Sequence, residues 1–411
     1  MRNAKCEMRG GNVRLKTTTG LFTLLVLTML AANSRSPVVA QTDSAAIIAR
    51  IEAAQAPNRQ GLDALTLAEV MQKFRVPGVS VAVIKDFKIH WAKSYGVADV
   101  EQQRPVQIDT LFQAASISKP VTAMAVMSLV QEGRISLDAD INTLLKSWQV
   151  PKNDHTRNTP VTLRGLLSHT SGADDGFGFP GYELTAARPT AVQVIEGQKP
   201  SNVGPVVFAR PPFQSYKYSG GGYTIVQLAL TDLLAQPFAE IMRAGVLSPL
   251  GMTHSTFEQP LPDALAARAT RAHSAQGKPM GVPWHVYPEQ AAAGMWTTPG
   301  DLAKFVIEIQ RAVVGREGAV LKQAAAREML SPTGVGPAGV TVRLEQRNEG
   351  WYFVHGGSNW GFRANMLGHV RKGYGIVTMT NGDAGQLVIA EIEARVAAAY
   401  GWDSLDKPLV R

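Results

Sequence analysis

Hydrophobic, largely β-branched runs predict strands near both ends of the chain. Residues 78–96, GVSVAVIKDFKIHWAKSYG, hold two β-branched runs on either side of Lys85-Asp86, which is typical of an antiparallel hairpin. Three more strand-like runs lie late in the chain, at residues 350–357, 361–370 and 373–381. Because these strands come from distant parts of the chain, the pattern predicts one sheet that both ends complete.

The stretch between these strands has a helical pattern. Residues 121–130 are apolar almost all the way round, so the helix that they predict is buried on most sides, and Gly133 suits its end. Residues 161–172 and 221–242 predict the clearest helices of a middle region rich in proline and glycine. A closing helix is predicted over residues 384–400, with one apolar face made of Leu387, Val388, Ile392 and Val396.

These elements predict the fold class and the domain organisation. We expect an α/β (α+β) fold in which an antiparallel sheet is flanked by helices and a mainly helical subdomain is inserted. Residues 41–135 together with 291–411 are expected to form the sheet-and-helix subdomain, and residues 136–290 the helical one. A chain of 411 residues with 45% hydrophobic residues and 38 glycines is long enough for two such parts around a shared core.

The distribution of charge argues against a nucleic-acid partner. The net charge is +8, but six basic residues and one acidic residue fall within residues 1–40, so the rest of the chain carries only +3. In that first segment a basic stretch precedes the apolar residues 21–32, and small residues lead up to Ala40, which is typical of a secretory signal. We expect cleavage after Ala40, a secreted or periplasmic protein and no stable membrane insertion afterwards. An uncleaved anchor is the alternative, although the apolar run is short for a bilayer span.

Cysteine chemistry is excluded from the expected mature chain. The only cysteine, Cys6, lies in the segment that we expect to be removed. Disulfides, zinc sites with cysteine ligands and a thiol nucleophile are therefore not expected.

A serine and a lysine stand one helical turn apart where the apolar run 121–130 begins. Ser116 and Lys119 are separated by three residues, so on a helix they share one face and lie within reach of a hydrogen bond. A serine hydroxyl is a weak nucleophile that needs a base and donors for the oxyanion it creates. If the helix begins near Ser116, its first N–H groups have no helical partner and can supply such a donor, and Pro120 removes only an N–H of that kind.

Other catalytic arrangements are missing from the sequence. There is no G-x-S-x-G element and no H-E-x-x-H, and the eight histidines are scattered, so we expect no metal and no cofactor. Residues 176–181 and 334–339 match G-x-G-x-x-G by letter, but both contain proline and neither lies between a strand and a helix. They are interpreted as loops.

Three motifs in order carry a family resemblance. They are SISK (116–119) as S-x-x-K, YSG (218–220) at the place of Y-x-N, and HGG (355–357) at the place of K-T-G. With supporting stretches such as LLSHTSG (166–172) and TTPGDLAKF (297–305), the chain from about residue 60 to 400 resembles the serine hydrolases related to class C β-lactamases and D-alanyl-D-alanine carboxypeptidases.

The resemblance implies a role for each motif residue. Ser116 becomes the acyl-forming nucleophile, Lys119 its activating neighbour and Tyr218 the general base that passes the proton to the leaving group. A tyrosine has an ordinary pKa near 10, so this role requires nearby cations that favour its phenolate. The backbone N–H groups of Ser116 and Ser358 would form the oxyanion hole.

Two positions depart from the family pattern. Gly220 stands where the family has asparagine. His355, which the resemblance places among the catalytic residues, stands where the family's lactamases have lysine, although a histidine version occurs among its peptidases and esterases. Gly356 and Gly357 complete the substrate side, because glycine lets another backbone approach a strand edge closely. His169 is interpreted as a structural residue at a helix end, and Arg363 as an exposed strand arginine.

Together these features predict a serine hydrolase that forms a covalent acyl-enzyme with a small-molecule or peptide substrate. The two departures favour an ester or small amide over a β-lactam. A penicillin-binding carboxypeptidase or class C-like β-lactamase, an acyltransferase and a non-catalytic binding protein on the same scaffold remain open alternatives.

Overall fold

The computed structural model describes residues 37–58, 60–175, 178–347 and 350–402. The chain divides into two compact units, Met1–Thr42 and Asp43–Arg411, and the sheet, the core and the site all lie in the second. The predicted signal segment, residues 1–40, falls almost wholly outside the described residues. Its cleavage therefore stays a prediction.

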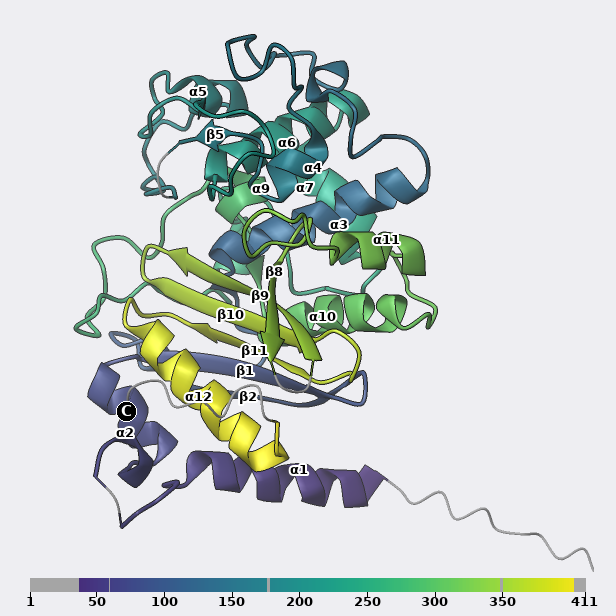
Figure 1. The fold of residues 1–411 in the computed structure, drawn as a ribbon. Coiled ribbons are helices and arrows are strands. Elements are labelled where there is room, and N and C mark those ends of the chain that lie inside the picture. The colour runs from purple at the N-terminus through teal and green to yellow at the C-terminus, as the bar shows by residue number, and fades with distance from the viewer. Residues whose placement is uncertain (1–36, 59, 176–177, 348–349, 403–411) are drawn as a thin grey trace, which may run out of the picture. The chain divides into compact units, whose positions relative to one another are not determined.

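The second unit is built on one antiparallel sheet with strands from both ends of the chain (Figure 1). The sheet order is β3-β2-β1-β11-β10-β9-β8, and every neighbouring pair is antiparallel. The strands are β1 (Gly78–Lys85), β2 (Lys88–Asp99), β3 (Arg104–Pro105), β8 (Arg343–Arg347), β9 (Gly350–Asn359), β10 (Phe362–His369) and β11 (Gly375–Thr380). The predicted hairpin, the three late strands and the fold class are thereby confirmed, whereas β8 was not predicted.

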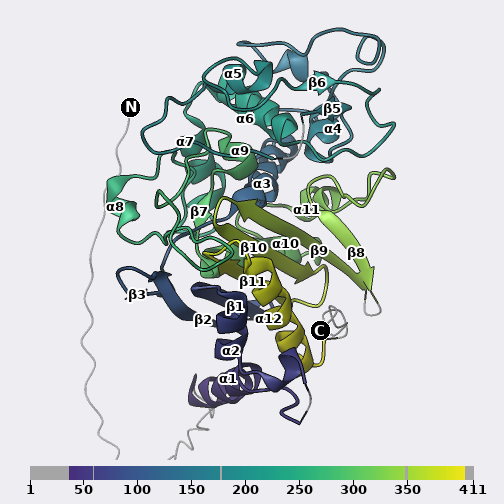
Figure 2. The same cartoon turned by 90° about the vertical axis from the view of Figure 1, so that its left-hand side faces the viewer.

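Helices cover both faces of this sheet. Helix α12 (Gly385–Tyr400) crosses one face, where it contacts β10 and β11, and α2 (Leu67–Phe74) packs against α12 (Figure 2). Helix α10 (Pro299–Val313) lies on the other face and contacts β1, β10 and β11. The apolar side chains accordingly form two clusters, a small one under α12 and a large one that continues into the helical part of the unit.

The helical part surrounds α3 (Ser118–Gln131), whose side chains are almost all buried. This confirms the buried helix predicted over 121–130, and Gly133 follows it with a φ of 71° that favours glycine. The remaining helices are α1 (Pro37–Glu52), α4 (Leu163–Leu167), α5 (Ala191–Glu196), α6 (Gly220–Leu234), α7 (Phe238–Met242), α8 (Asp263–Ala266), α9 (Gln290–Ala293) and α11 (Gln323–Met329). Short strand pairs join β4 (Phe112–Gln113) to β7 (Trp296–Thr297) and β5 (Ala173–Asp174) to β6 (Val207–Phe208).

Three of the helix predictions are wrong in detail. The helix predicted over 161–172 is a single short helix, α4. The helix predicted over 221–242 is broken between α6 and α7, where Ala235 adopts a left-handed φ of 52° and Pro237 cannot continue the hydrogen-bond ladder. On α12, Leu387 is 53% exposed, so it does not belong to the buried face formed by Val388, Ile392 and Val396.

No single helix of the described residues is long and apolar enough to cross a membrane. Helix α6 and the stretch Phe238–Leu247 together have the length and apolar composition of a membrane span, but they are bent against each other by 85°.

Candidate active site

Ser116 lies in a tight turn ahead of α3. The turn is a 3-10 helix over Ala115–Ile117 that leads directly into α3 at Ser118, which agrees with a helix start near Ser116. Ala115 has a left-handed φ of 50°, which is uncommon for a residue with a side chain and is often found at functional sites. The buried hydroxyl of Ser118 donates to the carbonyl of Ala115 (2.6 Å) and accepts from the N–H of Met295 (3.0 Å). These bonds hold the turn that presents Ser116.

Lys119 lies beneath Ser116 with its amine inside the protein. Its side chain is 2% exposed, and Nζ donates to Ser116 Oγ at 3.2 Å and to the carbonyl of Ala292 at 2.7 Å. Nζ is also 5.0 Å from the ring centroid of Tyr218 and 5.7 Å from that of Tyr223. The S-x-x-K spacing therefore produces the serine–lysine contact that the sequence predicted, and the fold brings the tyrosine of the second motif to the same amine.

Tyr218 reaches this amine from the segment just before α6. The next residue, Ser219, caps α6 by accepting the N–H of Gly222 at 2.8 Å. The ring of His169 lies 4.4 Å from the Tyr218 ring, and His169 Nδ1 accepts the N–H of Ser219 at 3.2 Å. Since Nδ1 accepts, the proton of the neutral imidazole resides on Nε2.

His169 is a wall of the site as well as a helix-end residue. Burial, followed by the charge of Lys119, holds the pKa of His169 well below the ordinary value, so the ring is neutral. The sequence placed His169 correctly after α4 but missed its position beside Tyr218. The only signal was its place in the LLSHTSG stretch.

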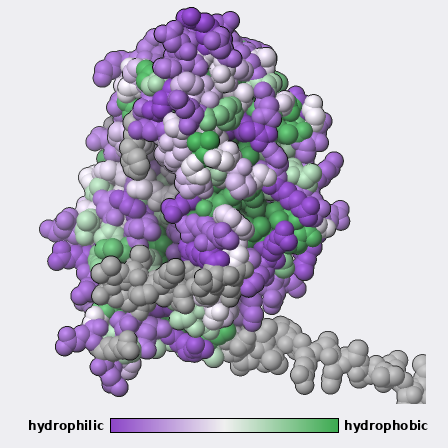
Figure 3. Space-filling view, viewed as in Figure 1, coloured by the Kyte–Doolittle hydropathy of each residue, from purple (hydrophilic) through white to green (hydrophobic). Residues whose placement is uncertain are grey.

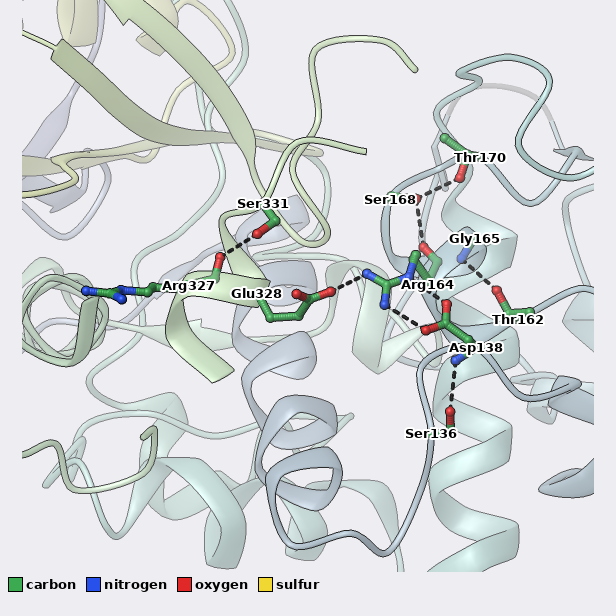
Figure 4. Close-up of polar contacts among 10 residues, drawn as sticks. All are labelled: Ser136, Asp138, Thr162, Arg164, Gly165, Ser168, Thr170, Arg327, Glu328 and Ser331. Carbon is green, nitrogen blue, oxygen red and sulfur yellow. Dashed lines mark hydrogen bonds and ion pairs between the residues drawn. The ribbon is translucent and has the colours of Figure 1, made fainter. Parts of the chain in front are cut away.

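An arginine fork holds the helix that carries this histidine. Arg164 on α4 binds Asp138 through two bonds (2.6 and 2.8 Å) and also binds Glu328 on α11 (Figure 4). At the end of α4, Ser168 Oγ donates to the Arg164 carbonyl at 2.7 Å. The bidentate pair holds the pKa of the Asp138 carboxyl below its usual value. These bonds thus fix α4 and the loop with His169 to the segment of Asp138 and to α11.

The third motif forms the open end of β9. Strand β8 pairs with β9 only as far as Val354, so residues 355–358 extend beyond its last register partner. His355 Nδ1 lies 2.7 Å from the carbonyl oxygen of Gly356, which can only accept, so this nitrogen carries the proton and Nε2 is an acceptor. Burial, followed by the charge of Lys119, lowers the pKa of His355 to about 4. The imidazole is therefore neutral near pH 7.

The two glycines of HGG differ in what surrounds them. A Cβ at Gly357 would lie 2.2 Å from the carbonyl oxygen of Ala114, whereas a Cβ at Gly356 would meet nothing nearer than 3.8 Å. The backbone of β9 therefore approaches the turn with Ser116 most closely at Gly357. Ser358 follows directly, which places its backbone N–H group next to this approach.

One cavity of about 1520 Å³ brings the predicted residues together. Its lining includes Ser116, Tyr218, His355, Gly356, Gly357 and Ser358. Lys119 and Gly220 do not line it: Lys119 lies behind Ser116, and the Phe179 ring occupies the space in front of Gly220, 2.6 Å from where a Cβ would be. Figure 3 shows the face seen in Figure 1, where green surface from apolar residues and pale surface from residues of intermediate hydropathy lie near the centre.

Several lining residues were not predicted. They come from separate stretches, and include Phe179, Tyr216, His285, Trp360 and Glu393. Arg363 also lines the cavity, but its guanidinium binds Asp383 at 2.9 Å and the carbonyls of Asn359 and Phe362. The interpretation of Arg363 as an exposed strand arginine is therefore wrong. Within the part of the chain that the structure describes, no group of three or more acidic, histidine or cysteine side chains is arranged to hold a metal ion.

This arrangement is suited to acyl transfer through a serine. A hydroxyl in contact with a buried lysine amine, a tyrosine beside the same amine and a strand edge across from them are the parts that such chemistry needs. The arrangement also leaves a large cavity for the substrate.

Comparisons with known proteins agree with this reading. The Beta-lactamase family model matches residues 64–400. Esterase EstB of Burkholderia gladioli is 26% identical over 357 residues, which cover 79% of this chain and 83% of EstB. Protein flp of Staphylococcus aureus (strain N315) is 24% identical over 324 residues, and the match spans 76% of this chain but only 61% of that relative.

Solved structures show the same fold at low identity. A penicillin-binding protein homologue from Pyrococcus abyssi has a TM-score of 0.64 and 22% identity, with 84% of this chain and 77% of that chain covered. The D-alanine carboxypeptidase AmpC from Burkholderia cenocepacia has a TM-score of 0.63 and 20% identity, with 87% and 99% covered. By its family match and its fold, the chain belongs to the β-lactamase family of serine hydrolases.

Proposed function

We propose that the protein is a secreted or periplasmic hydrolase that cleaves neutral esters or small amides through an acyl-enzyme on Ser116. The observation that carries the proposal is the contact of Lys119 Nζ with Ser116 Oγ at 3.2 Å, directly behind a cavity that Ser116 and Tyr218 line. An esterase among the relatives supports the substrate class.

The proposed reaction uses each motif in turn. Ser116 Oγ attacks the substrate carbonyl carbon and its proton passes to the Lys119–Tyr218 pair, while the backbone N–H groups of Ser116 and Ser358 stabilise the oxyanion. The bond to the leaving group breaks and the leaving group takes the proton from Tyr218. Water then attacks the acyl-enzyme, Tyr218 accepts its proton, and Ser116 regains a proton as the carboxylic acid is released.

The preference for neutral substrates rests on His355. Its Nδ1 proton is engaged by the Gly356 carbonyl, and burial with the nearby charge of Lys119 keeps the ring uncharged. A neutral imidazole with Nε2 as an acceptor has no charge to attract a substrate carboxylate. This distinguishes the site from one with lysine at the same position.

A labelling experiment tests the nucleophile. A fluorophosphonate probe is expected to modify the wild-type protein and to leave Ser116→Ala unmodified, with modification mapped by mass spectrometry. Equal labelling of both proteins would contradict the mechanism. A screen of p-nitrophenyl esters, nitrocefin and D-amino-acid amides then ranks the substrate classes.

A penicillin-binding carboxypeptidase is the second candidate, and its support is the fold shared with AmpC and with penicillin-binding proteins. It predicts slow and stable acylation of Ser116 by penicillin, whereas the ester hydrolase turns over nitrophenyl esters. Preference for an amine or alcohol over water as acceptor would indicate an acyltransferase. No burst with any activated ester would indicate a binding protein.

Secretion is tested at the N-terminus. The full chain is expressed in a bacterial host and the exported product is sequenced. The expected first residue is Gln41, and a product that retains residues 1–40 in the membrane fraction would support the uncleaved anchor instead.

A further inference from the structure

An aromatic ring stands where the family pattern has a polar side chain. A Cβ built on Gly220 would lie 2.6 Å from Phe179 Cε2, which is closer than real side chains approach, and 3.1 Å from its Cζ. With the ring in place, only glycine fits at position 220. The Phe179 ring therefore occupies the space that a side chain at position 220 would need.

Phe179 is held in this position by the backbone on its C-terminal side. Tyr182 and Val286 exchange N–H to carbonyl bonds of 2.9 and 2.7 Å, and His285 Nδ1 lies 2.8 Å from the Pro180 carbonyl. A Cβ at Gly181, which has a φ of 76°, would lie 2.7 Å from His285 Cβ, so these two segments are in close contact. The ring is therefore carried by a segment that is fastened to 285–287.

The neighbouring part of the same cavity is also aromatic. His285 stacks on Trp360 with ring centroids 4.0 Å apart and an interplanar angle of 2°, and both side chains line the cavity together with Phe179 and Ser116. Tyr216 lines it as well. Flat apolar faces of this kind bind aromatic groups by stacking and by removal of apolar surface from water.

The charged lining residues come from other stretches of the chain than Phe179 and His285. The described lining residues between Ser116 and His285 in sequence include no carboxylate, ammonium or guanidinium group. The charged ones come from β8, β10 and α12 or the turn before it: Arg343, Glu345, Arg347, Arg363, Asp383 and Glu393. Phe179 and His285 thus offer a substrate aromatic contact, and the charged pair next to Trp360, Arg363 with Asp383, is joined at 2.9 Å.

We infer that Phe179, His285 and Trp360 form an aromatic subsite that selects substrates with an aromatic group next to the scissile ester or amide. This inference rests on the proposed function, because it names the substrate class of that same site. Gly220 is required because it admits the Phe179 ring.

Two substrate pairs test the subsite and show whether it binds the acyl side or the alcohol side of the scissile bond. Methyl phenylacetate is compared with methyl acetate for the acyl side, and benzyl acetate with ethyl acetate for the alcohol side, with acid release followed in a pH-stat. We expect kcat/KM of the wild type to favour the aromatic member of one pair by roughly tenfold or more, the scale of one buried apolar group. Phe179→Ala should remove most of that preference.

Further variants separate this effect from misfolding. Phe179→Leu keeps an apolar side chain without a flat ring and should lose most of the preference, with a thermal unfolding midpoint near that of the wild type. Trp351→Ala removes an aromatic that is 44% exposed and outside the cavity lining, so it should retain the wild-type preference. Gly220→Asn should lose the preference for the aromatic substrate because the asparagine displaces the Phe179 ring. The double variant Phe179→Ala/Gly220→Asn should lose no more of the preference than either single variant, since the two residues are in contact.

Two results would overturn the inference while the proposed function stands. They are fluorophosphonate labelling of wild-type Ser116 with no preference in either pair, and a preference that persists in both Phe179 variants. Failure of wild-type labelling would instead reject the proposed function itself.

Discussion

Gly357 is the residue at which one added methyl group should disable the site without touching the reacting groups. In Gly357→Ala the new Cβ would lie 2.2 Å from the Ala114 carbonyl oxygen, whereas ordinary contact begins at 3.4 Å. The two segments must therefore separate by roughly 1 Å, and both sides of the clash are backbone. Ala114 cannot yield freely, since its N–H is bound to the Met295 carbonyl at 2.9 Å.

The separation displaces the Ser358 end of β9 from the turn with Ser116. A misplacement of about 1 Å in an active site costs about 10²-fold in rate, which is about 2.7 kcal/mol of transition-state stabilisation. We expect kcat/KM of Gly357→Ala for p-nitrophenyl acetate to fall by about that factor. Gly356→Ala is the matched control, because its Cβ would meet nothing within 3.8 Å, and it should stay within about threefold of the wild type.

The assay is initial-rate hydrolysis, with thermal unfolding of each variant to verify folding. A Gly357→Ala protein that is folded and within about threefold of wild-type kcat/KM would refute the close approach of β9 to the Ser116 turn. Equal losses of kcat/KM in Gly357→Ala and Gly356→Ala would refute the argument that only Gly357 lies too close to another backbone for a side chain.

Three further predictions follow from the site and the core. Tyr218→Phe keeps the ring but removes the proton carrier, so kcat should fall by about 10²–10⁴, and a change within about threefold would show that Tyr218 carries no proton. His355→Lys adds a charge where a pKa of about 4 keeps the imidazole neutral, so at pH 8 kcat/KM for an anionic substrate relative to its methyl ester should rise by about 1 kcal/mol, and a flat or falling ratio counts against the assignment. Glu289 is fully buried, no other residue in the described part of the chain binds its carboxylate oxygens, and burial raises its pKa from 4.5 to about 7. Because the folded-state pKa lies above the unfolded one, wild-type stability is lost as pH rises from 4.5 through 7. Relative to the wild type, Glu289→Gln should therefore gain up to about 3 kcal/mol of unfolding free energy in urea titrations as pH rises from 4.5 to 8. A stability difference between the two proteins that does not change with pH would disprove this argument.

The strands and the motif residues could be predicted because their signals are local. Short β-branched and apolar runs mark the strands, of which β1 and β11 are buried on both sides, and the spacing of Ser116 and Lys119 determines a contact within one turn. The break between α6 and α7 could not be placed from apolar periodicity alone, which runs through Pro237 without interruption. Its proline was the signal that should have divided the helix.

The aromatic wall could not be predicted for a different reason. Phe179, His285 and Trp360 come from three stretches that share no local pattern and meet only through the fold. The sequence showed that Gly220 departs from the family pattern, but it could not show which side chain fills the space. His169 was judged by its helix-end position, and its contact with Tyr218 depends on the same long-range packing.

The central pairing of β1 with β11 has a consequence for synthesis of the chain. Residues 79–84 pair with residues 375–380, so the middle of the sheet cannot form until almost the whole polypeptide has been synthesised. Contacts of such sequence separation slow folding, and until they form β1 exposes one unpaired edge. A truncated product that ends before residue 375 would keep Ser116 and Lys119 but would lack the strand that closes the sheet, and its bare edge would make it prone to aggregate.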